Sequence, residues 1–333
     1  LLTCAGRRRY LVDYFKQSLD GKGLVIGTDM SPTAPALEIC DRWHLVPNVY
    51  DPGYIEILLE ICRKEKIAAV ISLNDLELPI LARHRMEFRS VGAEVVVSNI
   101  EAIRLCSDKW ATVQLAKELD IPTPATFLDV PSVNEAVEKG DIRYPLIVKP
   151  RWGSASFGLF VVEDAEELSV FFNLCTKRVK KSYLAQFAES DQVVIIQEFI
   201  QGQEYGLDIF NDLEGRYRGL VCKKKLAMRG GETDKATTVS SERFAGYAQR
   251  LAERLHHVGN LDCDFLEDER GLFLLELNPR FGGGYPFSHE AGARLTDILL
   301  QCLSGQAENI SIQYKENMTF SKCDILVPSR NEL

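Results

Sequence analysis

The stretch that decides the fold is Leu274-Leu275-Glu276-Leu277-Asn278-Pro279-Arg280, in the last fifth of the chain. Its leucines predict a buried strand, which ends at Pro279 because proline has no amide hydrogen to donate. Glu276 and Asn278 are two residues apart, so a strand places both side chains on one face. A carboxylate in so apolar a strand is costly unless it is paired or holds a ligand. The alternative interpretation is a strand that simply ends in a polar turn.

A second strand precedes this one, and it carries Asp262-Cys263-Asp264-Phe265. The turn at residues 267–271 predicts an antiparallel hairpin, which brings Asp264 close to Glu276 and Asn278. Oxygen ligands gathered in this way suit Mg²⁺, which also takes phosphate oxygens and water. Arg280 follows directly, where a guanidinium can meet a developing oxyanion.

A third motif is Val148-Lys149-Pro150, followed by a loop at residues 151–158 that contains Gly153, Ser154, Ser156 and Gly158. A lysine that ends a buried strand, followed by a glycine- and serine-rich loop, can hold phosphates through its charge and the loop amides. The order differs from a Walker loop, because GxxxxGK[ST] is absent. A tight hairpin with a surface lysine is the alternative.

Two further segments are less specific. Gln197-Glu198-Phe199-Ile200, followed by Glu204 after a glycine turn, offers a backbone edge to adenine and a carboxylate to ribose; solvent-facing glutamates are the alternative. Residues 223–235 collect three lysines, Arg229 and Lys235 around two glycines. We expect a mobile loop there that closes on phosphates or an anionic substrate. A solvated basic loop is equally compatible with the sequence.

The first third of the chain alternates short apolar runs with helical patterns. This alternation predicts βαβ units and a parallel sheet, followed by a break at residues 100–107 and a helix capped by Ser107. The Asn74–Glu77 spacing favours a helix-capping pair over a substrate-reading pair. Beyond residue 121 the pattern predicts antiparallel sheet. The expected strands are 1–4, 23–28, 68–73, 94–98, 146–149, 159–162, 193–199, 204–210, 217–224, 262–267 and 272–277, and the expected helices are 54–66, 76–84, 108–119, 163–173, 242–256 and 286–303.

Composition narrows the class of protein. The 333 residues carry 39 Lys and Arg against 48 Asp and Glu, a net charge of −9, which argues against nucleic acid or an anionic membrane as the main partner. Apolar runs stay far below the 18 residues that a membrane span needs. The nine cysteines are scattered, which suits a reducing cytoplasm and no disulfide framework.

Taken in this order, together with Ser107-Asp108-Lys109, the motifs resemble the ATP-grasp superfamily over residues 1–305. The resemblance is strongest to single-module proteins like the carbamoyl-phosphate synthase large subunit. It implies an α/β and α+β fold with a Rossmann-like pre-ATP-grasp domain at residues 1–106 and an ATP-grasp domain at 107–305. The latter comprises a small lid lobe at about 121–195 and a C-terminal lobe of antiparallel sheet. Residues 306–333 would form a C-terminal extension.

The resemblance also implies roles for individual residues. Lys109 and Lys149 would contact the ATP phosphates, and the loop that contains Gly153, Ser154, Ser156 and Gly158 would cover them. Glu198, Phe199 and Ile200 would line the adenine site, and Glu204 would hold the ribose. Asp264, Glu276 and Asn278 would bind Mg²⁺ or, in its place, Mn²⁺, and Arg280 would steady the acyl phosphate. From the basic segment we add Lys235 and Arg229 as candidate reacting groups.

The implied activity is an ATP- and Mg²⁺-dependent ligase that activates a carboxylate as an acyl phosphate for attack by an amine or ammonia. Expected partners are these small molecules and, by default at this size, a second copy of the chain. One alternative is a carbamoyl-phosphate synthase-like module acting on bicarbonate, although one module without a glutaminase weakens it. Another is a regulator that binds ATP without catalysis. A nicotinamide dehydrogenase is disfavoured, because GxGxxG does not follow the first strand.

Overall fold

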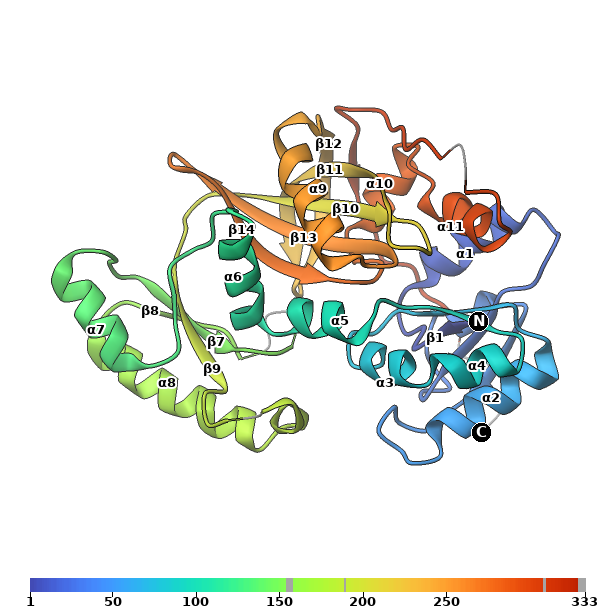
Figure 1. Ribbon diagram of the computed structural model, residues 1–333, viewed down its shortest axis with the longest axis horizontal. Coiled ribbons are helices and arrows are strands. Elements are labelled where there is room, and N and C mark those ends of the chain that lie inside the picture. The colour runs from blue at the N-terminus through green and yellow to red at the C-terminus, as the bar shows by residue number, and fades with distance from the viewer. Residues whose placement is uncertain (154–157, 189, 308–309, 329–333) are drawn as a thin grey trace.

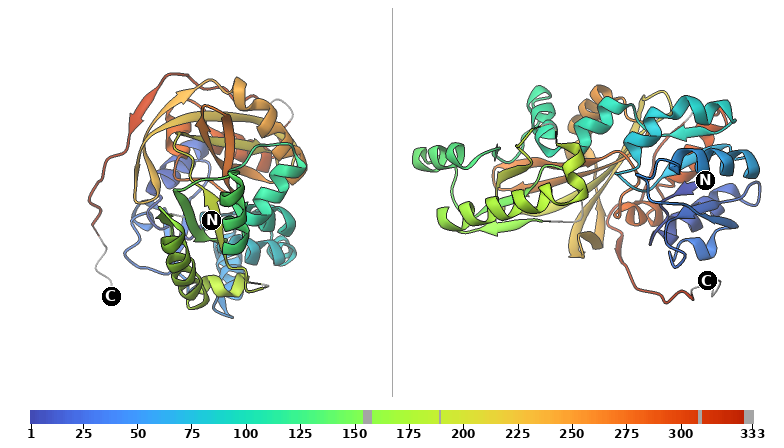
Figure 2. Two further views of the ribbon diagram at one scale, coloured as in Figure 1. Left: turned by 90° about the vertical axis from the view of Figure 1, so that its left-hand side faces the viewer. Right: turned by 90° about the horizontal axis from the view of Figure 1, so that it is seen from below.

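The computed structural model describes residues 1–153, 158–188, 190–307 and 310–328, and over these the chain forms three lobes in a row (Figure 1). An N-terminal α/β lobe lies at one end and a small lid lobe at the other. The lobe between them is built on a twisted antiparallel sheet. Seen from below, the molecule is elongated along this row (Figure 2).

The N-terminal lobe contains a parallel sheet with strand order β3-β2-β1-β4-β5. Its order reverses between β1 and β4, and in parallel sheets ligands bind beyond the carboxyl ends of strands at such a point. The strands and helices are β1 (Leu2–Thr3), α1 (Arg9–Leu19), β2 (Ile26–Asp29), β3 (Arg42–Leu45), α2 (Tyr54–Glu65), β4 (Ala69–Ser72), α3 (Leu78–Arg83), α4 (Arg85–Ser90) and β5 (Glu94–Val96). The predicted parallel sheet is confirmed.

The lid lobe has an antiparallel sheet of order β6-β9-β7-β8, covered on one side by helices (Figure 1). Its core is apolar and separate from those of the other lobes, so the lid is a packed unit. The elements are β6 (Thr126–Phe127), α7 (Val130–Lys139), β7 (Leu146–Pro150), β8 (Phe160–Val162), α8 (Ala165–Lys180), the 3₁₀ helix η2 (Tyr183–Phe187) and β9 (Val194–Glu198).

The central lobe is an antiparallel sheet of order β14-β13-β10-β11-β12-β15. One face is apolar and packs on α5, α6 and α9, while the opposite face carries most of the buried charge. The elements are α5 (Ile100–Ser107), α6 (Lys109–Glu118), β10 (Gln203–Asn211), β11 (Tyr217–Arg229), β12 (Glu232–Val239), α9 (Glu242–Leu255), β13 (Gly259–Asp268), β14 (Gly271–Asn278), α10 (Tyr285–Glu290), α11 (Leu295–Leu303) and β15 (Thr319–Ser321). The predicted mixture of parallel and antiparallel sheets is therefore confirmed.

The N-terminal lobe docks against the central lobe through α1 and the α10–α11 pair. The Tyr14 ring stacks on His289 with ring centroids 3.5 Å apart, and its hydroxyl donates to Glu290 at 2.7 Å. A shared apolar cluster includes Phe15, Phe281 and further residues from both lobes. This packing fixes the loop after β4 relative to the end of β14.

Several local predictions were wrong. Residues 100–107 form helix α5 instead of a break, because Asn99 caps it by accepting from the Ala102 amide. Ser107 is therefore the last residue of α5, and Asp108 caps α6. The helix expected over 286–303 is two helices, separated where Gly292 takes a φ of +108°.

The predicted capping role of Glu77 is also wrong. Its side chain is buried and accepts hydrogen bonds from Thr3, Ser72 and Tyr54 at 2.6, 2.5 and 2.5 Å. Burial raises the pKa of this carboxyl, and the three donors oppose that rise. Glu77 thus holds β1, β4 and α2 together, a contact between distant segments that local spacing cannot reveal.

The basic segment at 223–235 is not a loop. Strands β11 and β12 run through it as a hairpin, and β15 pairs with β12 to continue the sheet. Lys223 and Lys225 are buried on the polar face of the sheet, whereas Lys224 points to the opposite face. No helix in the described part of the chain is long and apolar enough to cross a membrane.

Candidate functional site

The site lies on the polar face of the central sheet, on the strands β10, β11, β13 and β14. Asp264 pairs across the sheet with Glu276, and Asp262 pairs with Asn278, so all four side chains share one face. A bulge follows at Leu275, which lets two residues of β14 oppose one of β13. The structure therefore brings the predicted metal-binding residues Asp264, Glu276 and Asn278 together.

The Asp264 carboxylate is already engaged by a lysine. Lys225 Nζ lies 2.7 Å from Asp264 and 2.6 Å from Glu204, and only 6% of its side chain is exposed. Burial raises the pKa of Asp264, and the Lys225 ammonium opposes that rise. This lysine therefore joins the predicted ribose residue to the predicted metal residue.

Glu276 and Asn278, unlike Asp264, have side chains without a partner among the described residues. Both are half-buried, and neither side chain forms a hydrogen bond or ion pair with another residue of the described ranges. The described residues contain no group of three or more His, Cys, Asp or Glu placed to hold a metal ion. Two oxygen donors side by side nevertheless suit Mg²⁺, which completes its octahedron with water and phosphate oxygens.

Lys149 lies in the lid near the end of β7, close enough to Glu276 for that carboxylate to affect its pKa. Its Nζ donates to Gln197 Oε1 at 2.7 Å, and it forms no ion pair among the described residues. Burial lowers the pKa of Lys149 to about 7; Lys109 lowers it further, and Glu276 opposes the change. Lys109 opens α6 and donates to the carbonyl of Gly153 at 2.5 Å. Two ammonium groups are thus held near each other, and no carboxylate of the described residues is bound to either.

Gly153 and Gly158 border the predicted phosphate loop. Both adopt positive φ, +99° and +67°, which glycine alone takes up without strain. A Cβ at Gly158 would come within 3.2 Å of the Pro150 ring. Ser154 and Ser156 lie outside the described residues.

The chain leaves the lid at β9 through Glu198, Phe199 and Ile200. Glu198 accepts from the Ala125 amide at 3.2 Å and from Arg270 at 2.6 Å, so its carboxylate links the lid to the β13–β14 turn. Ile200 is buried and Phe199 is 37% exposed. Within the described residues, the peptide groups of Phe199 and Ile200 make no backbone hydrogen bond outside the strands.

Arg280 is clamped between two lobes. Its Nη2 donates to Asp75 at 2.7 Å, and its Nη1 donates to Asp262 at 3.2 Å. Burial raises the pKa of Asp262 to about 6, the neighbouring Asp264 adds to the rise, and Arg280 opposes it. Gly282 packs so closely here that a Cβ would lie 2.1 Å from Asp262 Cγ.

The other two predicted reacting groups lie elsewhere. Arg229 is half exposed near the tip of the β11–β12 hairpin, where it pairs with Asp234 and Asp324. Lys235 is exposed. Its neighbour Ala236 pairs with Lys225 and so shares the polar face, which leaves Lys235 on the opposite face of the strand. Lys235 therefore points away from the polar face, and the structure does not bring these two cations to the site.

Sequence reasoning missed several charged residues of this face. A fully buried Lys223–Asp208 pair, 2.5 Å apart, is joined by Asn260 and Ser288. Asp75, Asp262 and Lys225 were not assigned either. The available signal was charge at every second position on adjacent strands, which marks one polar face.

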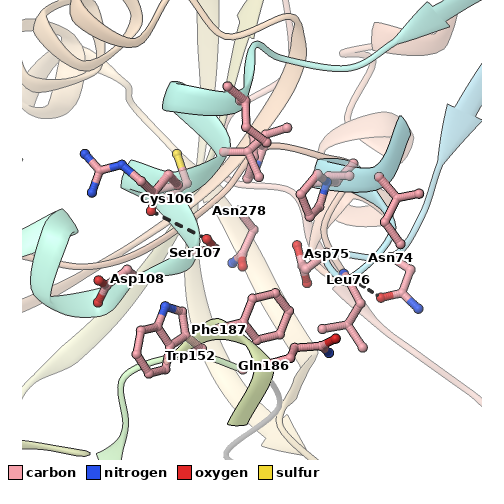
Figure 3. A pocket seen from close by; sticks show the side chains of 18 of the residues that line it. Asn74, Asp75, Leu76, Cys106, Ser107, Asp108, Trp152, Gln186, Phe187 and Asn278 are labelled. Atoms are coloured by element: carbon pink, nitrogen blue, oxygen red, sulfur yellow. Dashed lines mark hydrogen bonds between the residues drawn. The ribbon is translucent and has the colours of Figure 1, made fainter. Parts of the chain in front are cut away.

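Beside Glu276 and Asn278 the surface is hollowed into a cavity of about 810 Å³. It lies between the loop after β4, the α5–α6 junction and the η2 helix of the lid. In Figure 3 the side chains of Asp75, Asn278 and Phe187 converge on this space. The cavity adjoins the two unpaired oxygen donors, so a bound molecule can reach them.

Comparison of the sequence with protein families shows which proteins this chain is similar to. Residues 106–284, more than half of the chain, match the ATP-grasp domain, and residues 1–96 match the PylC-like N-terminal domain. The carbamoyl phosphate synthase large chain of Clostridium acetobutylicum is 23% identical over 297 residues, which are 86% of this chain and 26% of that protein. This chain therefore spans about a quarter of the length of that relative.

Two further matches cover a larger share of the matched protein. The 3-methyl-D-ornithine--L-lysine ligase of Methanosarcina acetivorans is 24% identical over 303 residues, 89% of this chain and 71% of that protein. The biotin carboxylase domain of Hydrogenobacter thermophilus 2-oxoglutarate carboxylase, solved with MgADP and bicarbonate, has the same fold. Its TM-score is 0.75 at 14% identity, over 96% of this chain and 72% of that one. The chain therefore belongs to the ATP-grasp domain family.

Proposed function

We propose that the chain is an ATP- and Mg²⁺-dependent ligase that activates a carboxylate as an acyl phosphate and passes the acyl group to an amine or ammonia. The observation that carries this proposal is Lys149, whose buried Nζ forms no ion pair with any described residue and whose pKa is raised by Glu276 of the central sheet. An unpaired buried charge is costly. The surroundings of Lys149 therefore suit a bound anion, and a nucleoside triphosphate supplies one.

The contacts support one orientation of ATP. Lys109 and Lys149 would bind the phosphates, beneath the loop that contains Gly153, Ser154, Ser156 and Gly158. The peptide groups of Phe199 and Ile200 have no backbone partner outside the strands among the described residues, which supports their pairing with adenine. Glu198 is held by Arg270 and would fix the exit from β9. Glu204, steadied by Lys225, would bind the ribose hydroxyls.

The unpaired oxygens of Glu276 and Asn278 support a magnesium site, in which Mn²⁺ can replace Mg²⁺. When bound, the ion would neutralise phosphate charge during transfer. Asp264 is held by Lys225, so we place it beside the ion as the residue that positions that lysine. Arg280 lies next to the cavity and would steady the acyl phosphate. The reacting-group roles of Arg229 and Lys235 stay predictions.

The proposed reaction has two transfers. A carboxylate oxygen of the substrate attacks the γ-phosphorus, and ADP leaves with the electrons of the broken P–O bond. The amine nitrogen then attacks the acyl carbon, inorganic phosphate leaves with the electrons of the C–O bond, and the amine releases a proton. Such transfers depend on positioning and charge neutralisation, which the lysines and Arg280 provide.

The test is ADP release from Mg-ATP across a panel of amino acids, dipeptides, bicarbonate and small acids, each with and without an amine or ammonia. A stimulation that requires both a carboxylate and an amine supports the proposal. Stimulation by bicarbonate and ammonia alone would instead favour the carbamoyl-phosphate synthase-like reaction. Tight ATP binding without any stimulation would contradict ligation and favour the regulator.

A further inference from the structure

Asp108 and Arg151 form an ion pair between the start of α6 and the lid, which lie next to each other in Figure 1. Arg151 Nε and Nη2 donate to the two carboxylate oxygens of Asp108 at 3.0 and 2.5 Å. Only 9% of the Asp108 side chain and 13% of the Arg151 side chain are exposed. A two-pronged pair of this kind specifies one geometry, because both groups are planar and the two hydrogen bonds are parallel.

Each partner is held firmly in its own lobe. Asp108 is the N-cap of α6, and its Oδ1 also accepts from the Trp110 amide at 3.0 Å. Arg151 directly follows β7, where its amide donates to the Val193 carbonyl at 3.1 Å and its Nη1 donates to the Gln192 carbonyl at 2.9 Å. The ion pair therefore joins a helix end of the central lobe to the sheet of the lid.

Each partner also lies close in sequence to a proposed phosphate lysine. Lys109 follows Asp108, and Lys149 precedes Arg151 by two residues. The Lys109 amide donates to the Arg151 carbonyl at 3.0 Å, which is a second bond across the same junction. The two ammonium groups repel each other, since Lys109 lowers the pKa of Lys149. The Asp108–Arg151 pair is placed to oppose this repulsion.

Another ion pair between the lid and the central lobe, Glu198–Arg270 at 2.6 Å, lies where the chain leaves the lid. Half of the Arg270 side chain is exposed, and exposed pairs are screened by solvent and contribute little. Breaking a buried pair, in contrast, leaves an uncompensated charge. Of the two pairs, Asp108–Arg151 is therefore the better suited to fix the lid beside α6.

We propose that Asp108 and Arg151 are positioning residues, which hold Lys109 and Lys149 at the separation that the ATP phosphates require. The proposal rests on the proposed function for the role of the two lysines in phosphate binding. Asp108 and Arg151 act through the lysines and do not themselves touch the nucleotide. They hold the two ammonium groups in place before ATP arrives, which reduces the entropy lost on binding.

Two substitutions separate position from charge. Asp108→Asn removes a negative charge near the phosphates, so charge alone would leave ATP binding unchanged or strengthen it. The same variant keeps the helix cap, because asparagine is as good an N-cap as aspartate. Arg151→Met removes a positive charge, so charge alone would weaken ATP binding. If the pair positions the lysines, both variants weaken it.

The experiment is calorimetric binding of ATP, and of adenosine by competition, to the full chain and to Asp108→Asn, Arg151→Met and the double variant. Each single variant should weaken ATP binding by about tenfold, since a displaced lysine loses a charge-assisted hydrogen bond. Adenosine lacks the phosphates, so its affinity should change by less than about twofold. The double variant should lose no more than either single one, because the two residues act as a unit.

Three results would overturn the proposal. The first is unchanged or stronger ATP binding in Asp108→Asn, and the second is an equal loss for ATP and adenosine. The third is additive losses in the double variant, because Arg151 would then bind ATP independently of Asp108. As a matched control, Arg254→Met breaks an exposed arginine pair with Glu118 of the same helix, at 2.7 Å, and should leave both affinities unchanged.

The milder variant Arg151→Lys covers the case in which Arg151→Met does not fold. It keeps the charge and loses the two-pronged geometry, so it should also weaken ATP binding and spare adenosine. Pair-dependent ATP binding without ADP release would reject the ligase function and leave the positioning roles standing. ADP release with unchanged ATP affinity in the variants would reject the positioning roles alone, and absence of ATP binding in the wild type would overturn both.

Discussion

The Lys149 ammonium lies 2.7 Å from the amide oxygen of Gln197, and this neutral oxygen is its hydrogen-bond partner among the described residues. A buried cation is usually matched by a carboxylate. Two nearby charges act on the pKa of Lys149 here. Lys109 lowers that pKa, and Glu276 of the central lobe raises it. Among the described residues no carboxylate pairs with this lysine, and a bound anion would supply the counter-charge and raise its pKa again.

Lys149→Met should weaken ATP binding by about tenfold to hundredfold, because a charge-assisted hydrogen bond contributes about 1.5–3 kcal/mol. The same variant should raise the melting temperature without ATP by several degrees, since it removes an unpaired buried charge. Calorimetry and thermal unfolding measure the two effects. A fall in both ATP affinity and melting temperature would indicate that Lys149 stabilises the fold instead.

ATP binding should depend on pH through the same lysine. With a pKa of about 7, Lys149 is charged below pH 7 and increasingly neutral above it. ATP binds the charged form and raises its pKa, so affinity should be flat below pH 7 and fall by up to tenfold per unit above it. Lys149→Arg stays charged and should abolish this dependence. A wild-type affinity that rises above pH 7 would contradict the assignment.

Glu276→Gln should remove magnesium-dependent ADP release and leave metal-free ATP binding nearly intact, because it exchanges a carboxylate ligand for an amide. Loss of several kcal/mol of charge stabilisation corresponds to roughly 10²–10³ in rate. Glu269→Gln, in the exposed turn of the same hairpin, is the matched control. Unchanged turnover at low Mg²⁺ in Glu276→Gln would reject the metal site.

Arg280→Lys should lower kcat by roughly 10²–10³ if this guanidinium stabilises the charge that develops during transfer. Lysine keeps the charge but offers one nitrogen in place of the two that donate to Asp75 and Asp262, so it loses the planar, two-pronged geometry of the guanidinium. Steady-state kinetics with ATP and both substrates separate the effect on kcat from that on KM. A raised KM for ATP at unchanged kcat would assign Arg280 to nucleotide binding instead.

Lys225→Met should destabilise the fold by about 3–5 kcal/mol, because it leaves Asp264 and Glu204 without their shared cation. Lys224→Met removes the same side chain on the opposite face and should change the free energy of unfolding by less than about 0.5 kcal/mol. Urea unfolding compares the two variants. Adding Asp264→Asn and Glu204→Gln to Lys225→Met should recover part of the loss, and no recovery would contradict the ion-pair explanation.

The sequence alone predicted the strand that carries Glu276 and Asn278, because an apolar run indicates a buried strand whatever segment packs against it. It also predicted the parallel N-terminal sheet, since alternating strand and helix patterns are local. Helix α5 was missed because it has only 8 residues and its exposed face includes the apolar Ile100, so little of a helical period can be seen. The 223–235 segment was misread because alternating buried and exposed lysines resemble a charge run.

Tertiary structure decided the remainder. The clamp on Arg280 joins residues 75 and 262, the Lys225 bridge joins residues 204 and 264, and Glu77 joins residues 3 and 72. Each depends on strand register and on the docking of one lobe against another. The alternation of residues along a strand determines which face each side chain occupies. The charge that pairs with it, however, belongs to a segment distant in sequence. For this reason residue types and faces could be read from the sequence, and their partners could not.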